Sequence, residues 1–199
     1  MHYSTEKNDH GLPHNPFKAI VAPRPIGWIS TMSAKGEVNL APYSFFNAIS
    51  TYPPIVAFSS DERKDSLTFA EETGEFVCSL ATYELRDAVN ATSTPFPRGV
   101  NEMEKAELAP APSKFVKPPR VAASPAALEC KWISTNRIKD MHGKDTSCWL
   151  VMGQVVGVYI DDRFIKNGVV DTAAMQPLAR CGYYDYAAVM ESFQLKRPK

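Results

Sequence analysis

Two stretches decide the fold of this chain: Pro23-Arg24-Pro25-Ile26-Gly27-Trp28-Ile29-Ser30-Thr31 and, shortly after it, Asn39-Leu40-Ala41-Pro42-Tyr43-Ser44-Phe45-Phe46-Asn47. The first is typical of a short strand that ends in two hydroxyl side chains. The second is entered through a proline and alternates aromatic residues with Ser and Asn. Apolar walls with a few placed polar groups are what a planar, partly charged ligand requires. Together the two stretches predict a site for such a ligand.

A third stretch, residues 59–66, adds cations and hydroxyls directly before an expected helix. A phosphate monoester needs backbone N–H groups, hydroxyls and at least one cation. Arg63 and Lys64 offer the charge, and Ser60 and Ser66 offer hydroxyls. The alternative is that Arg63 and Lys64 form a solvated surface turn. We interpret the three stretches as a site for a phosphorylated aromatic cofactor.

The aromatic part of that cofactor needs flat apolar walls and a few polar groups at its edge. Trp28, Phe45 and Phe46 are candidate walls, and Ser44 and Asn47 are candidates for the polar edge. Two Phe residues in a half-buried strand can equally belong to the core. The amide of Asn47 is surrounded by apolar residues in the sequence, so it should have hydrogen-bond partners if it is buried. The alternative is that Asn47 only hydrogen-bonds within a nearby turn.

The bulk properties point to one domain spanning residues 1–199, with a lead at about 1–14 and a tail at about 187–199. Lys and Arg total 22, and so do Asp and Glu, so no charge excess predicts binding to nucleic acid or to a membrane surface. No segment approaches the roughly 20 apolar residues of a membrane span, and the N-terminus does not resemble a signal peptide. The cysteines are scattered without a Cys-x-x-Cys pair, which favours a reduced, cytoplasmic protein: Cys78, Cys130, Cys148 and Cys181.

Strand-like apolar runs outnumber helical patterns, which predicts a mainly β protein, a barrel with a few inserted helices. The expected strands are Ile26–Met32, Val38–Ala41, Ile55–Ser59, Phe76–Ala81, Ala127–Ser134 and Leu150–Ile160. One expected helix, Ser66–Thr73, lies behind a capping Asp65 and stops at Gly74. The proline-rich segment 109–125 is read as an ordered excursion rather than as a linker, because neither half of the chain alone has enough strands to close a barrel.

The chain resembles the flavin reductase-like family of FMN-binding split β-barrel proteins, whose barrel is antiparallel with Greek-key connections. The resemblance rests on PRPIGWIST (23–31), NLAPYSFFNAIS (39–50), PPIVAFSS (53–60) and RKDS (63–66), and it continues through 128–130, 150–156 and 177–180. The set formed by 44–47 with Arg63 and Lys64 is fairly specific, whereas any single piece of it is weak.

The resemblance implies FMN as the cofactor, NAD(P)H as the hydride donor, and a flavin or another small molecule as the acceptor. It also implies a homodimer with the cofactor near the subunit interface. Ser30 and Thr31 would then approach the phosphate or the ribityl chain. His142 is a loose match to a nicotinamide-contacting histidine, although its polar loop could equally be solvent-exposed. The reaction would be carried by the cofactor, so no catalytic acid–base pair is expected among the side chains.

Other readings stay open. No dinucleotide-binding glycine motif, P-loop or nucleophile elbow is present. A metal site at His10 and His14 is not expected, because Gly11 and Pro13 between them break any helix that could align the two histidines. A non-catalytic flavin or haem carrier would fit the same fold, as would a flavoprotein that takes electrons from a protein donor. The sequence does not identify the final acceptor, the preferred nicotinamide, or whether FMN stays bound.

Overall fold

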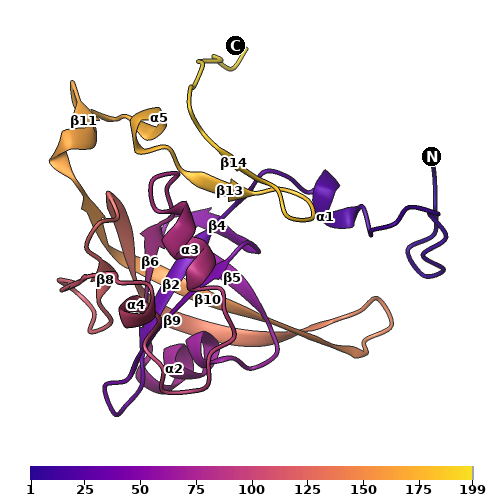
Figure 1. Ribbon diagram of the computed structural model, residues 1–199, viewed down its shortest axis with the longest axis horizontal. Helices are drawn as coiled ribbons and strands as arrows, with labels where there is room; N and C mark the ends of the chain where they lie inside the picture. The colour runs from indigo at the N-terminus through magenta and orange to yellow at the C-terminus, as the bar shows by residue number, and fades with distance from the viewer. Residues whose placement is uncertain (199) are drawn as a thin grey trace.

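The computed structural model describes residues 1–198 and is mainly β (Figure 1). Its strands are β1 (Arg24–Pro25), β2 (Gly27–Met32), β3 (Val38–Tyr43), β4 (Phe46–Thr51), β5 (Pro54–Asp61), β6 (Glu75–Leu80), β7 (Pro110–Ala111), β8 (Arg120–Val121), β9 (Ala126–Lys139), β10 (Asp145–Ile160), β11 (Ile165–Lys166), β12 (Val169–Val170), β13 (Leu178–Arg180) and β14 (Tyr186–Ala188). Its helices are α1 (Phe17–Ile20), α2 (Asp65–Thr73), α3 (Arg86–Ala91), α4 (Glu102–Lys105), the 3-10 turn η1 (Asp162–Phe164) and α5 (Thr172–Met175).

A seven-stranded antiparallel sheet in the order β3-β2-β6-β9-β10-β5-β4 forms the barrel. Its two edges, β3 and β4, are consecutive in the chain and are joined only by Ser44 and Phe45. Strands that lie six positions apart in a sheet can be joined so briefly only if the sheet curls until its edges meet. The result is a barrel that is split between β3 and β4, with the Ser44–Phe45 corner at the split.

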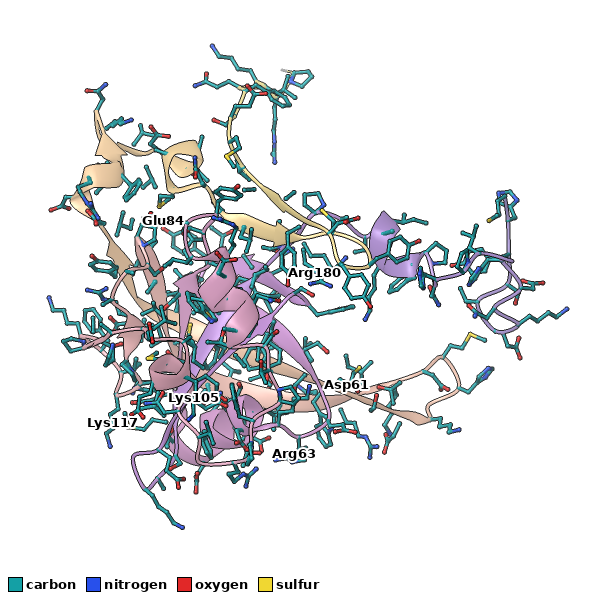
Figure 2. All side chains as sticks on the ribbon, viewed as in Figure 1. Asp61, Arg63, Glu84, Lys105, Lys117 and Arg180 are labelled. Carbon is teal, nitrogen blue, oxygen red and sulfur yellow. The ribbon has the colours of Figure 1, made fainter. Side chains whose placement is uncertain are left out.

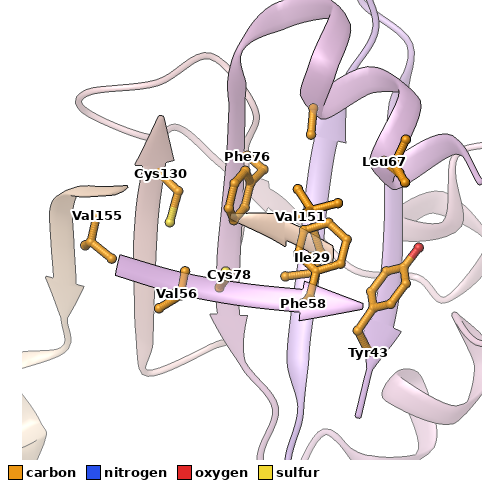
Figure 3. Packing of buried hydrophobic residues seen from close by; sticks show 11 residues of the cluster. Ile29, Tyr43, Val56, Phe58, Leu67, Phe76, Cys78, Cys130, Val151 and Val155 are labelled. Atoms are coloured by element: carbon orange, nitrogen blue, oxygen red, sulfur yellow. The ribbon is translucent and has the colours of Figure 1, made fainter. Parts of the chain in front are cut away.

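Strand β2 is buried on both faces, which places it between two hydrophobic layers. One layer is the barrel interior, where Ile29, Phe58 and Phe76 are completely buried (Figure 3). The other layer contains Trp28 and Leu40 and lies against residues of α3 and α4. Alternation along a strand sends successive side chains to opposite faces, so the same strand contributes to both layers.

The six expected strands are confirmed, and β9 and β10 are longer than expected. Their extra residues form a hairpin that projects from the barrel (Figure 1). Strand β4 was missed. Its sequence, FNAIST, was interpreted only as a ligand-binding segment, and all its residues are exposed or partly exposed because it is an edge strand.

Helix α2 forms where it was expected, and Gly74 ends it in the left-handed conformation with φ of 72°. The expected cap differs. Lys64 occupies the N-cap position without a side-chain cap, and Asp65 is the first helical residue. An acidic side chain in the first turn still complements the positive end of the helix.

The proline-rich segment 109–125 is ordered and held against the barrel by buried carboxylates. Glu129 of β9 accepts hydrogen bonds from the backbone N–H groups of Lys114 and Phe115, at 3.0 and 2.6 Å. Glu75 of β6 accepts one from the N–H of Lys117 at 2.7 Å. Burial alone would raise the pKa of Glu75, but hydrogen bonds from the Lys131 side chain and the Lys117 N–H outweigh it and hold the pKa below its usual range.

The expected N-terminal lead, residues 1–14, contains turns but neither helix nor strand in the structure. Of the expected tail, 187–199, residue 199 lies outside the described residues. Within residues 1–198, no helix is long and apolar enough to cross a membrane.

Candidate functional site

A cleft of about 640 Å³ lies at the Ser44–Phe45 corner, and we call it the α2 cleft. It brings together β3, the corner, the end of β5, the start of α2 and the loop that follows α3. The residues around it include Lys18, Asn39, Ala41, Pro42, Tyr43, Ser44, Phe45, Ser59, Asp61, Lys64, Asp65, Ser66, Thr92, Ser93, Thr94, Pro95, Phe96, Arg98 and Glu102. Four of the predicted cofactor-binding residues are among them: Ser44, Phe45, Lys64 and Ser66.

Two cations flank the first turn of α2 within this cleft. Lys64 is exposed at the N-cap position. Arg98 comes from the loop after α3, and its Nε donates a hydrogen bond to Asp65 Oδ1 at 2.8 Å. The backbone N–H groups of a helix N-terminus attract anions, and α2 is long enough to present such an end. The cleft therefore has the groups that a phosphate monoester requires. Arg98 was missed from the sequence because it lies 33 residues from its partner.

Arg63 is not among the residues around the α2 cleft, and its predicted contact with the phosphate stays a prediction. Its guanidinium forms an ion pair with Glu71 on α2, and its Cζ lies 4.9 Å from the centre of the Trp149 ring (Figure 2 labels Arg63 beside α2). These two partners hold Arg63 on the outer side of the barrel. Lys64, the next residue, faces the cleft instead.

Buried polar side chains at the α2 cleft form hydrogen bonds with one another. Ser66 Oγ accepts a hydrogen bond of 2.8 Å from Nδ2 of the buried Asn39. Burial raises the pKa of the Tyr43 phenol, and the neighbouring Ser66 and Ser60 hydroxyls oppose that rise only in part. The phenol therefore stays protonated at neutral pH and can donate a hydrogen bond.

The corner supplies the apolar part of the cleft. Phe45 is 45% exposed, and Lys18 Nζ and Arg24 Cζ lie 6.0 and 5.7 Å from its ring centre. Phe46 packs inward instead, against the bare Cα of Gly27, where an added Cβ would lie 2.6 Å from the Phe46 ring. Phe45 is thus the available aromatic wall, and Phe46 belongs to the core packing around the barrel interior.

Three further predicted residues are completely buried behind the cleft. Trp28 belongs to the core, and its Nε1 donates to Thr92 Oγ1 at 2.9 Å, so it supports the loop that lines the cleft from behind. Ser30 Oγ donates to the carbonyl of Pro119. Thr31 Oγ1 is buried without a hydrogen-bond partner in the described chain.

Ser60 is also completely buried, and its hydroxyl donates to the Glu62 carbonyl at 2.9 Å rather than into the cleft. Asn47 is exposed on the edge strand β4, and its Oδ1 accepts from the N–H of Ala48 at 2.8 Å. His142 is exposed at the tip of the β9–β10 hairpin, away from the start of α2 (Figure 1). The cofactor-edge role of Asn47 and the nicotinamide role of His142 stay predictions.

Carboxylates also border the cleft, and Glu102 is the most constrained of them. It is buried, and its Oε2 accepts a hydrogen bond of 2.8 Å from the backbone N–H of Leu40. Burial raises the pKa of the Glu102 carboxyl, with a further rise from the nearby Asp65 and only partial opposition from the Leu40 hydrogen bond. A raised pKa reduces the negative charge that this side chain presents to an anionic ligand.

A second cavity, of about 1050 Å³, adjoins the α2 cleft, and we call it the tyrosine cavity. It lies between the α1 segment and the loop joining β13 to β14. It shares Lys18, Pro42, Ser44 and Ser93 with the α2 cleft. The other residues around it include His14, Asn15, Phe17, Arg24, Ile26, Val89, Asn90, Arg180, Cys181, Tyr183, Tyr184, Asp185 and Tyr186. Within residues 1–198, no group of three or more His, Cys, Asp or Glu side chains is arranged to hold a metal ion.

Comparison with known proteins agrees with the barrel fold. The family model described as "Flavin reductase like domain" matches residues 21–177. The chain belongs to the flavin reductase-like family. This flavin reductase-like protein is 32% identical over 202 residues to an uncharacterised protein of Aquifex aeolicus, covering 98% of this chain and 100% of that relative.

Solved structures share the split-barrel fold of this flavin reductase-like protein. Component B of nitrilotriacetate monooxygenase from Bacillus cereus aligns with a TM-score of 0.89 and 25% identity, covering 98% of each chain. A protein of Shewanella frigidimarina with a split barrel domain aligns with a TM-score of 0.86 and 19% identity, covering 100% of each chain. Family membership makes the protein a flavin-related oxidoreductase.

The residues of the α2 cleft fit a flavin mononucleotide chemically. For a phosphate, the cleft offers Lys64, Arg98, the hydroxyl of Ser66 and the N-terminus of α2. For a planar ring, it offers Phe45 and Pro42 as apolar walls and the Ser44 hydroxyl as a polar group. The cleft thus contains the cations, hydroxyls and apolar wall that the phosphate, ribityl chain and ring of this ligand require.

Proposed function

We propose that this protein is an NAD(P)H-dependent flavin reductase that binds FMN in the α2 cleft. The observation that carries the proposal is the pairing of Lys64 and Arg98 at the first turn of α2, next to the aromatic corner at Phe45. Family membership supports a flavin ligand, and the charged end of the cleft favours a phosphorylated one.

In this proposal Lys64 and Arg98 bind the phosphate and Ser66 donates or accepts a hydrogen bond beside them. Ser44 binds the polar edge of the ring, and Phe45 covers one of its faces. Bound FMN supplies two-electron chemistry that accepts a hydride and passes electrons to a second acceptor. The chain's own residues bind and orient the ring and exclude water from it.

We further propose a homodimer. Val156 and Val158 of β10 are 38% and 59% exposed, and Ile49 of the edge strand β4 is 52% exposed. Exposed apolar side chains on strands of one sheet favour coverage by a second subunit. A dimer at micromolar concentration in sedimentation supports this, and a monomer that binds FMN tightly contradicts it.

We also propose that the chain forms one domain and works in the cytoplasm, where its four free thiols remain reduced.

The experiment that tests the site compares single variants in FMN and riboflavin binding. Lys64→Ala and Arg98→Ala should each weaken FMN binding by about tenfold or more, since a hydrogen bond to a charged group contributes roughly 1.5–3 kcal/mol. Riboflavin lacks the phosphate and should be affected far less. Fluorescence quenching of each flavin gives both affinities.

Arg63→Ala is the matched control, because Arg63 is a neighbouring cation that contacts Glu71 and Trp149 instead of the cleft. Its FMN affinity should stay close to that of the wild type. Equal losses of FMN and riboflavin affinity in Lys64→Ala, or an equal loss in Arg63→Ala, would overturn the assignment of the phosphate site.

The donor is tested on FMN-loaded protein. Loss of the yellow absorbance on addition of NADH or NADPH supports the reductase proposal, and comparing the two nicotinamides identifies the donor. FMN that stays oxidised with both nicotinamides, but is reduced by a protein donor, would replace the proposal with an electron-transfer flavoprotein. Colourless protein that develops a strong haem band would favour the haem carrier.

A further inference from the structure

The tyrosine cavity concentrates exposed aromatic side chains around one hollow. Tyr184 is 90% exposed, Phe17 50%, Tyr183 44% and Tyr186 40%. Aromatic side chains lose much of their contact with water when a flat ligand covers them, and they prefer stacked or edge-on partners. A concave site lined in this way favours a planar ring.

Arg180 and Lys18 are two of the cations that line the cavity. Arg180 stacks on Tyr186, with its Cζ 4.4 Å from the ring centre, and its Nη2 donates to the Tyr183 carbonyl. Arginine carries five N–H donors, so most of them remain free of partners within residues 1–198. Lys18 stands where the cavity meets the α2 cleft. Asp185 is the one carboxylate among the described lining residues, and its side chain is exposed.

Arg24 is a third cation beside the cavity, and its two terminal nitrogens donate to backbone carbonyls, whereas its buried Nε has no partner in the described chain. Its Nη1 donates to the Lys18 and Val21 carbonyls, and its Nη2 donates to the Cys181 carbonyl at 2.8 Å. Arg24 therefore ties the α1 segment to the β13–β14 loop. Figure 1 shows the two segments side by side, and Figure 2 labels Arg180 next to them.

Gly182 brings the same two walls together. A Cβ at Gly182 would lie 2.5 Å from Ala19 Cβ and 2.7 Å from Ala19 Cα, so only glycine allows this approach. The cavity is thus built on two segments that are fixed to each other by Arg24 and by the Gly182–Ala19 contact. Fixed walls lower the cost of ordering a site around a small ligand.

We propose that the tyrosine cavity binds a planar aromatic carboxylate, with its ring against Tyr184 and Tyr186 and its carboxylate on Arg180. A guanidinium matches a carboxylate by paired N–H···O hydrogen bonds. The shared wall at Pro42 and Ser44 sets this ligand next to the contents of the α2 cleft. Its role as a reaction partner of the flavin rests on the proposed function, whereas its binding depends only on the cavity.

Calorimetry with benzoate as the probe tests the proposal, on both FMN-free and FMN-loaded protein. Benzoate should bind at least about tenfold more tightly than benzamide, which keeps the ring and loses the charge, and than cyclohexanecarboxylate, which keeps the charge and loses the flat ring. Equal binding of benzoate and benzamide, or no binding of benzoate, would overturn the proposal on the wild-type protein alone.

Two variants then assign the residues. Arg180→Gln should weaken benzoate binding by about tenfold and leave benzamide unchanged. Tyr186→Leu should abolish the preference for benzoate over cyclohexanecarboxylate. Arg163→Gln is the matched control, because Arg163 is 81% exposed on η1 and pairs with Asp161. An Arg180→Gln variant that binds benzoate like the wild type would overturn the assignment.

The FMN-loaded arm separates the two proposals. Benzoate bound at the shared wall should shift the flavin absorbance spectrum of loaded protein. If FMN fails to bind but benzoate binds with the expected dependence on Arg180, the proposed function fails and the aromatic carboxylate site stands. If FMN binds tightly and benzoate does not bind, the carboxylate proposal fails and the flavin site stands.

Discussion

Arg98 and Asp65 lie 33 residues apart in the sequence and are joined by a hydrogen-bonded ion pair of 2.8 Å, from Arg98 Nε to Asp65 Oδ1. Asp65 is the first residue of α2, so the pair fixes the loop after α3 across the helix start. The pair also sets a carboxylate beside the proposed phosphate position. Asp65 thereby positions the Arg98 guanidinium, and its negative charge repels the phosphate that Arg98 would bind.

Asp65→Asn should strengthen FMN binding by about two- to fivefold, because it removes a negative charge worth roughly 0.5–1 kcal/mol near the phosphate and keeps an oxygen to accept from Arg98. Riboflavin affinity should not change. Fluorescence titration of both flavins measures the difference. Weaker FMN binding would mean that the charge of Asp65 is needed to hold Arg98 in place.

Glu102→Gln should raise the melting temperature at pH 7. Burial raises the pKa of the Glu102 carboxyl in the folded state. As the pH rises, the carboxyl therefore loses its proton at a lower pH in the unfolded chain than in the folded protein. Stability from this group is therefore complete below the ordinary glutamate pKa and falls as the pH rises from that value through the raised one. Glutamine keeps an oxygen for the Leu40 N–H and carries no charge.

The pH dependence is the control for that variant. The gain in melting temperature should shrink as the pH falls toward 4, because the wild-type carboxyl then becomes increasingly protonated in the unfolded state as well as in the folded one. A gain that is the same at pH 4 and pH 7 would show that the effect comes from packing. FMN should also bind somewhat more tightly to Glu102→Gln at pH 7, because Glu102 borders the α2 cleft.

Thr31→Val should stabilise the protein by about 1 kcal/mol. The Thr31 hydroxyl is buried without a partner in the described chain, and an unsatisfied buried polar group costs roughly 1–3 kcal/mol. Valine has nearly the same shape. Urea unfolding with and without FMN provides the measurement, and FMN affinity should be unchanged. Loss of FMN affinity would instead support the role that the sequence predicted for Thr31 near the phosphate.

Glu129→Ala should destabilise the protein by about 2 kcal/mol, because the N–H groups of Lys114 and Phe115 lose their acceptor. Glu129→Gln keeps one acceptor oxygen and should lose about half as much. Thermal unfolding compares the two variants. The ordered state of the proline-rich segment 109–125 depends on this anchor, so proteolysis should cut that segment faster in Glu129→Ala than in the wild type.

The residues predicted from the sequence that border the α2 cleft come from two short contiguous stretches. Ser44 and Phe45 follow directly from the pattern at the end of β3, and Ser66 with Lys64 follows from the start of α2. Strand length, alternation and the helix-ending glycine are local signals, which is why six strands and α2 were found. The edge strand β4 was missed because its exposed face gives little hydrophobic signal.

What the sequence could not decide is the direction of individual side chains and the contacts made over long distances. Arg63 and Lys64 are adjacent, and only the positions of Glu71 and Trp149 reveal that Arg63 turns outward. Arg98 enters the cleft through a loop with no local pattern. Trp28 was expected to wall the ligand site, and it is buried because β2 is covered on both faces.

The Ser44–Phe45 corner also bears on how the barrel folds. Its two residues join the outermost strands of the sheet, so bringing these two edges near each other costs little loop entropy. The costly pairing is that of β6 with β9, whose partners Ser79 and Ala127 are separated by α3, α4 and the proline-rich segment. Non-local strand pairing is the slow step in β proteins. The rate of folding should therefore change when residues of the β6–β9 ladder are substituted. Substitutions at the corner, which can form early in folding, should affect that rate less.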